Sequence, residues 1–240
     1  MESKASNSGG DVAAGPILDV PGSDSEKAIV FFSAMGVGNR RFHFLDVSQY
    51  ATYNRIFVRD VFDVWYHKGL VGETGNIEET TDLLREMITR RGFRKVTFVG
   101  TSAGGFAAIL FGALLGIDVV HAFSPRTFLG IRLRLRHRDF RSHRSLMRLY
   151  SLPKPNRVLD LKPILLESDG RTRYFLHFCL ESRLDRIHAF HLEQNDRINL
   201  FPYPCGGHLV AKHLREQEAL SQILEIEELE QMTKIHSTLA

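Results

Sequence analysis

The sequence predicts one α/β domain in which helices cover both faces of a mostly parallel sheet, a three-layer α/β/α sandwich. Segments rich in β-branched and aromatic residues alternate with segments whose apolar residues recur at helical spacing. Several strand segments are apolar on both faces, which is typical of strands buried between two helical layers. The chain has 240 residues, 43% of them hydrophobic, which suits one large domain with a sizeable core.

Seven strands are expected from the runs of β-branched and aromatic residues. Residues 17–20 predict a short edge strand, and the continuous apolar run at residues 28–33 predicts a central parallel strand. The other strands are expected at residues 56–59, 95–100, 118–124, 174–180 and 199–203.

Helices are expected between these strands. Residues 77–90 and 103–115 are each followed by a glycine, Gly92 and Gly116, as is common just past the end of a helix. Further helices are expected at residues 161–167, 186–193 and 208–224, the last either continuous or in two pieces that reach the terminus. Residues 1–15 predict a flexible tail, which leaves residues 16–240 as the domain.

Composition argues against several classes of protein. Cys179 and Cys205 are too few for a disulfide framework, and Cys179 is expected to be a buried thiol within a strand. No signal peptide and no membrane-spanning stretch is evident, so a cytoplasmic protein without a membrane partner is expected. No metal-ligand spacing occurs, and neither a metal nor an organic cofactor is expected. The net charge of +3, without a stacking platform or binding motif, predicts no nucleic-acid partner.

The most informative motif is Gly-x-Ser-x-Gly at residues 100–104, between a predicted strand and a predicted helix. Such a turn holds its serine in a strained backbone conformation at a helix N-terminus, where developing negative charge is favoured. Flanking glycines let the strand and helix approach closely. Ser102 is therefore the candidate nucleophile; the alternative is a tight turn with an idle serine, or a degenerate site.

A serine hydroxyl needs a base, and the base needs an acid that orients it. His208 follows the last predicted strand on a glycine-rich loop and is the candidate base. In enzymes built on this turn the acid lies between serine and histidine along the chain. Asp185 is favoured, because aspartate is the commoner acid and the loop needs some length. Glu181, directly at the strand end, is the alternative acid, and a helix N-cap is the alternative role for Asp185.

An oxyanion hole needs two backbone amides. One is expected from Ala103, the residue after the candidate nucleophile. The other is expected from the loop after the first core strand, at Met35, with Ala34 as the alternative.

The strand–turn–helix motif around Ser102, the nucleophile elbow, is followed along the chain by the candidate acid and then by the candidate histidine. With this order, residues 28–129 and 174–214 resemble the α/β-hydrolase superfamily. Residues 60–69, with Trp65 and Tyr66, and residues 122–125 resemble the corresponding segments of a bacterial subgroup of hydrolase-like domains. That subgroup is linked to polysaccharide or secondary-metabolite pathways. The superfamily includes esterases, thioesterases, peptidases, acyltransferases and members without hydrolytic activity, so the resemblance implies a mechanism and leaves the substrate open.

An arginine-rich segment, residues 126–157, stands where hydrolases of this fold often carry a lid insertion. The segment predicts a solvated, amphipathic lid whose charges face water. The alternative is an electropositive lid in which Arg132, Arg134 and Arg136 bind phosphate, pantetheine or carboxylate groups of an acyl donor.

These features predict a serine hydrolase that cleaves an ester or thioester through a covalent acyl-enzyme. An acyltransferase with the same three residues is the first alternative, and a non-catalytic or repurposed member of the fold is the second. The expected partner is a small-molecule or carrier-bound acyl substrate, with the oligomeric state left open.

Overall fold

The structure is a computed structural model, and it describes residues 15–38, 41–49, 51–168, 170–205 and 207–239. The predicted tail, residues 1–15, lies almost wholly outside the described residues. None of the helices within these ranges is long and apolar enough to cross a bilayer.

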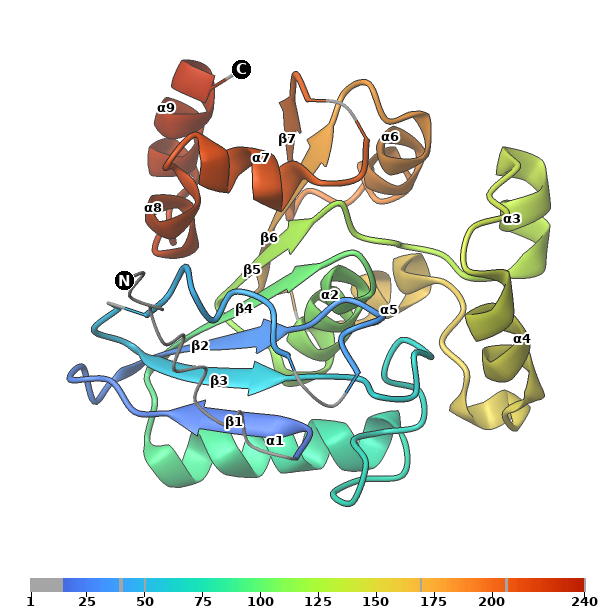
Figure 1. Ribbon diagram of the computed structural model, residues 1–240, viewed down its shortest axis with the longest axis horizontal. Coiled ribbons are helices and arrows are strands. Elements are labelled where there is room, and N and C mark those ends of the chain that lie inside the picture. The colour runs from blue at the N-terminus through green and yellow to red at the C-terminus, as the bar shows by residue number, and fades with distance from the viewer. Residues whose placement is uncertain (1–14, 39–40, 50, 169, 206, 240) are drawn as a thin grey trace, which may run out of the picture.

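Within the described residues, seven strands form one sheet in the order β1-β3-β2-β4-β5-β6-β7. Only the edge strand β1 runs antiparallel, and it pairs with β3; the other five pairings are parallel. The predicted mostly parallel α/β sandwich is therefore confirmed (Figure 1). The strand bounds are β1 Ile17–Val20, β2 Lys27–Phe32, β3 Asn54–Val58, β4 Lys95–Thr101, β5 Val119–Phe123, β6 Arg173–Cys179 and β7 Ile198–Tyr203.

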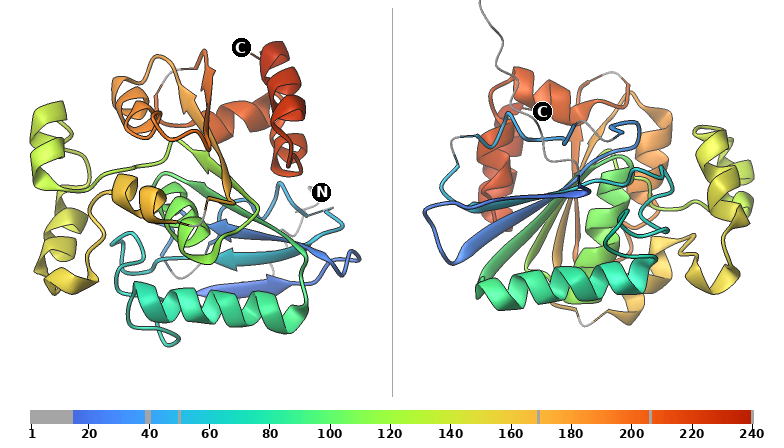
Figure 2. Two further views of the ribbon diagram at one scale, coloured as in Figure 1. Left: turned by 180° about the vertical axis from the view of Figure 1, so that it is seen from behind. Right: turned by 60° about the horizontal axis from the view of Figure 1, so that its bottom comes forward.

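Helices cover both faces of the sheet because its central strands are apolar on both sides. Along β2, Val30 and Phe32 pack toward one cluster of buried residues, whereas Ile29 and Phe31 pack toward another. The first cluster includes side chains of α1 (Ile77–Arg91), α2 (Ala103–Leu115) and α5 (Leu161–Glu167). The second includes side chains of α7 (Val210–Glu216), α8 (Leu220–Leu224) and α9 (Leu229–Leu239), so the two groups lie on opposite faces (Figure 2).

The ends of the two longest helices follow the sequence signals. Asn76 caps α1 by accepting a hydrogen bond from the Glu79 amide at 2.8 Å. Gly92 and Gly116 end α1 and α2 in the left-handed conformation that glycine adopts without strain. Of the two forms expected for residues 208–224, the structure has the divided one, with separate helices α7 and α8 and with α9 following them.

The arginine-rich segment forms α3 (Ile131–His137), α4 (His143–Ser151) and the short 3-10 helix η1 (Lys154–Asn156). Figure 1 shows α3 and α4 standing apart from the sheet, on the side toward which the parallel strands point. The segment therefore lies near the edge where the sequence places the candidate site.

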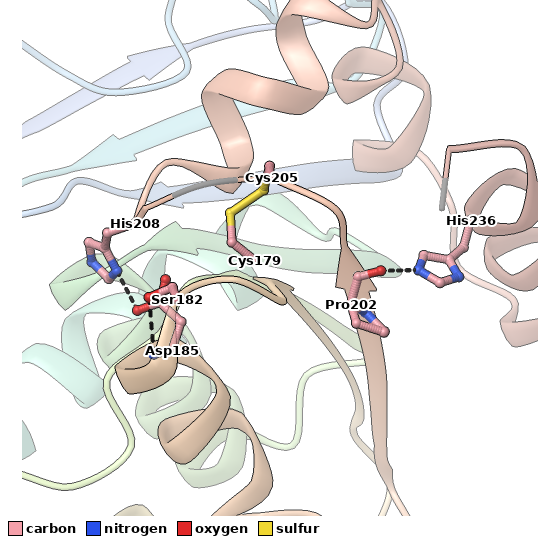
Figure 3. Close-up of a disulfide and its surroundings, with 7 residues drawn as sticks. All are labelled: Cys179, Ser182, Asp185, Pro202, Cys205, His208 and His236. Carbon is pink, nitrogen blue, oxygen red and sulfur yellow. Dashed lines mark hydrogen bonds and ion pairs between the residues drawn. A yellow bond between two sulfur atoms is a disulfide. The ribbon is translucent and has the colours of Figure 1, made fainter. Parts of the chain in front are cut away.

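The two cysteines correct one expectation. Cys179 ends β6, Cys205 follows β7, and their sulfur atoms form a disulfide (Figure 3). The expectation of a buried free thiol is wrong, because the spacing of two cysteines does not reveal that their strands are neighbours in the sheet. Disulfides persist in oxidising compartments and are rare in the cytoplasm, so this bond gives no support to the cytoplasmic location expected from the sequence.

Candidate active site

The Gly-x-Ser-x-Gly motif forms a sharp turn from β4 into α2. Ser102 has φ 53° and ψ −111°, a strained conformation for a residue with a side chain. A methyl group on Gly104 would overlap the carbonyl oxygen of Phe32, so only glycine allows this approach of helix and strand. The Ser102 amide donates to the carbonyl of Phe123 at 2.9 Å, which anchors the turn to β5.

Ser102, His208 and Asp185 are joined by a chain of hydrogen bonds, and we refer to them as the candidate triad. The Nε2 atom of His208 lies 2.8 Å from Ser102 Oγ. Its Nδ1 atom lies 2.7 Å from Asp185 Oδ1, a contact drawn in Figure 3. These three residues come from the end of β4, the loop after β7 and the first turn of α6 (Arg183–Phe190).

The environment of Asp185 favours its ionised form. Burial opposes ionisation, since the side chain is 1% exposed, but the hydrogen bond from His208 and the charge of Arg141 outweigh it. The pKa of Asp185 is therefore lowered from its usual value. An ionised Asp185 accepts the Nδ1–H of His208, which leaves Nε2 free to accept the hydroxyl proton of Ser102.

The two alternatives weighed for the acid have other surroundings. Glu181 is exposed on the turn after β6. The N-cap of α6 is Ser182, whose hydroxyl accepts from the Asp185 amide at 3.4 Å. Asp185 therefore does not cap α6, and its carboxylate hydrogen-bonds to His208 instead.

No protein-family model and no curated protein matches the sequence. Among solved structures, a capsule O-acetyltransferase of Neisseria meningitidis serogroup A superposes with a TM-score of 0.67 at 16% identity, over 88% of this chain and 92% of that one. A mutant of that protein in complex with CoA gives 0.67 at 15% identity, over 91% and 98%. The fluorophosphonate-binding serine hydrolase F of Staphylococcus aureus gives 0.60 at 9% identity, over 89% and 100%.

The chain has an α/β-hydrolase fold. The resemblance inferred from the elbow and the residue order is thereby confirmed at the level of the fold. At these identities the likeness extends to architecture, and the roles of individual residues rest on their own geometry.

Oxyanion donors in the α/β-hydrolase fold come from the elbow and from the loop after the first core strand. The Ala103 amide begins α2 and so has no partner within the helix. In the other loop, the Ala34 amide donates to Nδ1 of His43 at 3.0 Å, and the Gly36 amide donates to Asp63 at 2.8 Å. The Met35 amide between them makes no hydrogen bond with any described residue. Ala34 is therefore engaged elsewhere, which favours Met35 of the two.

The structure does not bring Arg132, Arg134 and Arg136 together. Because α3 is helical, Arg132 and Arg136 share one exposed face, whereas Arg134 lies on another, is 7% exposed and contacts the hydroxyl of Tyr150. No shared anion site forms among these three.

Two other arginines lie closer to the candidate triad and were not singled out from the sequence. The Arg126 amide donates to the Ser102 carbonyl at 3.4 Å, and its guanidinium lies over the ring of Trp65 at 5.6 Å. Arg141 donates to Asp185 Oδ1 at 3.3 Å. For Arg126 a signal existed, because it follows the carboxyl end of β5 by three residues. Arg141 is one of nine arginines in residues 126–157, and nothing in the pattern distinguishes it.

Proposed function

We propose that this protein is a serine-dependent enzyme that cleaves an ester or thioester through a covalent acyl-enzyme. The observation that carries the proposal is the hydrogen-bond chain from a strained Ser102 through His208 to a buried, ionised Asp185. A serine that merely caps a turn needs neither a histidine at 2.8 Å nor a carboxylate behind it.

In the first half-reaction, Ser102 Oγ attacks the substrate carbonyl while its proton passes to His208 Nε2. Asp185 stabilises the resulting imidazolium, and the Ala103 and Met35 amides donate to the oxyanion. The tetrahedral intermediate collapses as His208 gives the proton to the leaving alcohol or thiol, and an ester on Ser102 remains. A water or an acceptor hydroxyl then loses its proton to His208 and attacks that ester. His208 returns the proton to Ser102 Oγ as the carboxylic acid or the new ester leaves.

A fluorophosphonate probe tests the nucleophile directly. We expect stoichiometric labelling of Ser102, its loss in Ser102→Ala, and much slower labelling in His208→Ala, because the serine then lacks its base. Ser145, an intermediate-exposure serine on α4, supplies the matched control, since Ser145→Ala should label normally. A folded wild-type protein that takes no label would contradict the proposal and favour a non-catalytic member of the fold.

A second candidate is transfer of the acyl group to a hydroxyl instead of to water. The similarity of this chain to a capsule O-acetyltransferase, and to a mutant of it in complex with CoA, over about nine-tenths of both chains supports this candidate. We propose an acyl thioester as donor and a carbohydrate hydroxyl as acceptor. Release of CoA from acetyl-CoA that increases with added oligosaccharide, with acetylated oligosaccharide as product, would establish transfer. Formation of free acetate alone would establish hydrolysis.

A further inference from the structure

A buried cluster of ionisable side chains surrounds Asp185, the acid of the candidate triad. Its members are Arg126, Asp139, Arg141, Asp185 and His188. They come from three places: the segment after β5, the turn between α3 and α4, and α6. All but Arg141 are 3% exposed or less, and the Arg141 side chain is 28% exposed. Charges at this depth are costly unless each is paired.

Asp139 is the centre of this cluster. Its Oδ1 accepts from the amide and Nε of Arg141 at 3.1 and 3.0 Å. Its Oδ2 accepts from Nη2 of Arg141 and from Nε2 of His188, both at 3.0 Å. Burial opposes its ionisation, but the bonds from His188 and Arg141 outweigh burial and lower the pKa of Asp139 below its usual range. Asp139 thus ties the α3–α4 turn to α6.

His188 contributes as a neutral side chain. Its Nδ1 accepts from the Thr127 amide at 3.1 Å, so the ring proton lies on Nε2 and points at Asp139. Burial lowers the pKa of His188 to about 4. The two carboxylates of the cluster therefore face two guanidinium groups, Arg126 and Arg141, and the buried charges balance.

Arg141 connects this cluster to the candidate triad. Two of its nitrogens hold Asp139, and its third, Nη1, donates to Asp185 Oδ1 at 3.3 Å. That same oxygen accepts the Nδ1–H of His208. The planar guanidinium thereby fixes the position of Asp185 Oδ1 relative to an anchored carboxylate, which a flexible ammonium group does less well.

We infer that Arg141 is a positioning residue for the triad acid, so that the site is complete only when the α3–α4 turn is docked on α6. This inference rests on the proposed function, because it assigns a role within that same site. The arginine-rich segment then has a role that its surface charge does not indicate, because one of its arginines, Arg141, donates a hydrogen bond to the triad acid.

The arrangement has a measurable kinetic consequence. Arg141 reaches the triad acid from the α3–α4 turn, so its loss removes one of the bonds that hold Asp185 Oδ1. An acid that is free to shift orients the His208 imidazole less well, which slows the chemical step and leaves substrate binding unchanged.

The test compares Arg141→Gln, Arg141→Lys and the control Arg144→Gln. Arg144 is an exposed arginine on α4, so its variant removes the same charge from the same segment. In Arg141→Gln we expect kcat to fall by roughly tenfold at unchanged KM, because the triad acid is no longer held in place. Arg141→Lys should recover only part of the lost kcat, because the charge stays and the three-point geometry is lost. Arg144→Gln should change neither.

Steady-state kinetics on an activated ester separates the effect on kcat from the effect on KM. If wild-type Ser102 takes no fluorophosphonate label, the proposed function fails, whatever the variants show. If Ser102 is labelled but Arg141→Gln lowers kcat no more than Arg144→Gln does, this inference is overturned. A loss of fold in Arg141→Gln leaves the decision to Arg141→Lys, where a wild-type kcat would also overturn it.

Discussion

Asp185 and Glu181 both follow β6, but their surroundings differ. Asp185 is almost wholly buried, and its carboxylate accepts hydrogen bonds from His208 and Arg141. Its backbone amide donates to the Ser182 hydroxyl. Glu181, in contrast, is exposed on a turn. A carboxylate that orients an imidazole must be held in place and kept ionised, and only Asp185 meets both conditions.

This difference gives a prediction for the two amide variants. Asp185→Asn should lower kcat on an activated ester by about 10⁴-fold, because the amide favours the wrong tautomer of His208. Glu181→Gln should change kcat by less than about twofold, since surface substitutions usually have small effects. Steady-state kinetics on both variants decides, and the reverse order would move the acid to Glu181.

Ser102, His208 and Asp185 could be found from the sequence because each belongs to a local pattern. The serine lies in a strand–turn–helix motif, the histidine on a glycine-rich loop, and the acid between them in chain order. Arg141 carries no such pattern, and its contact with Asp185 arises only where the α3–α4 turn packs against α6. The sequence therefore predicts the candidate reacting residues more successfully than it predicts the residues that hold them in place.

Among the elements, the loop after β7 carries the histidine of the candidate triad. It carries both Cys205 and, three residues later, His208. The Cys179–Cys205 disulfide fixes the start of this loop to the end of β6 (Figure 3). The strand and its loop were predicted, but the bond was not, since it depends on β6 and β7 being neighbours with Cys179 opposite Tyr203.

Removing this disulfide should affect both stability and reactivity. The two cysteines are 26 residues apart, and closing a loop of that length stabilises a protein by roughly 3 kcal/mol. We expect Cys179→Ala/Cys205→Ala, or reduction by dithiothreitol, to lower the free energy of unfolding by about that amount and to slow fluorophosphonate labelling. Urea unfolding and labelling rates measure the two effects. Reduction of the double variant is the control and should change nothing further; equal stability of the oxidised and reduced wild type would contradict the prediction.

The molecule as a whole holds its sheet together partly through a buried chain of polar side chains. The Tyr203 hydroxyl donates to Nδ1 of His177 at 3.1 Å, and His177 Nε2 lies 3.1 Å from His121 Nδ1. His121 Nε2 donates to the carbonyl of Ile226 at 2.8 Å. Every contact is satisfied when both histidines are neutral, with the proton on Nε2. The chain crosses β5, β6 and β7 and reaches the segment before α9.

These hydrogen-bonded histidines, together with the buried His188, predict how the stability of the folded state depends on pH. Burial lowers the pKa of His121 and of His188 to about 4 each, and lowers that of His177 well below its usual value. Unfolded histidines titrate near 6.5, so below that pH the unfolded chain binds more protons and the folded state loses stability. The lowered pKa values of Asp139 and Asp185 act only below about pH 4.

We therefore expect the free energy of unfolding to fall between pH 6.5 and pH 4, by about 1.4 kcal/mol per pH unit for each histidine that charges on unfolding. Urea unfolding at pH 7.5 and pH 5 measures the loss. His177→Gln removes one titrating group, so the variant should be less stable at pH 7.5 but lose less on acidification. His143→Gln, at an exposed position on α4, should keep the wild-type dependence. Equal stability of the wild type at both pH values would show that these histidines are not held neutral by the fold.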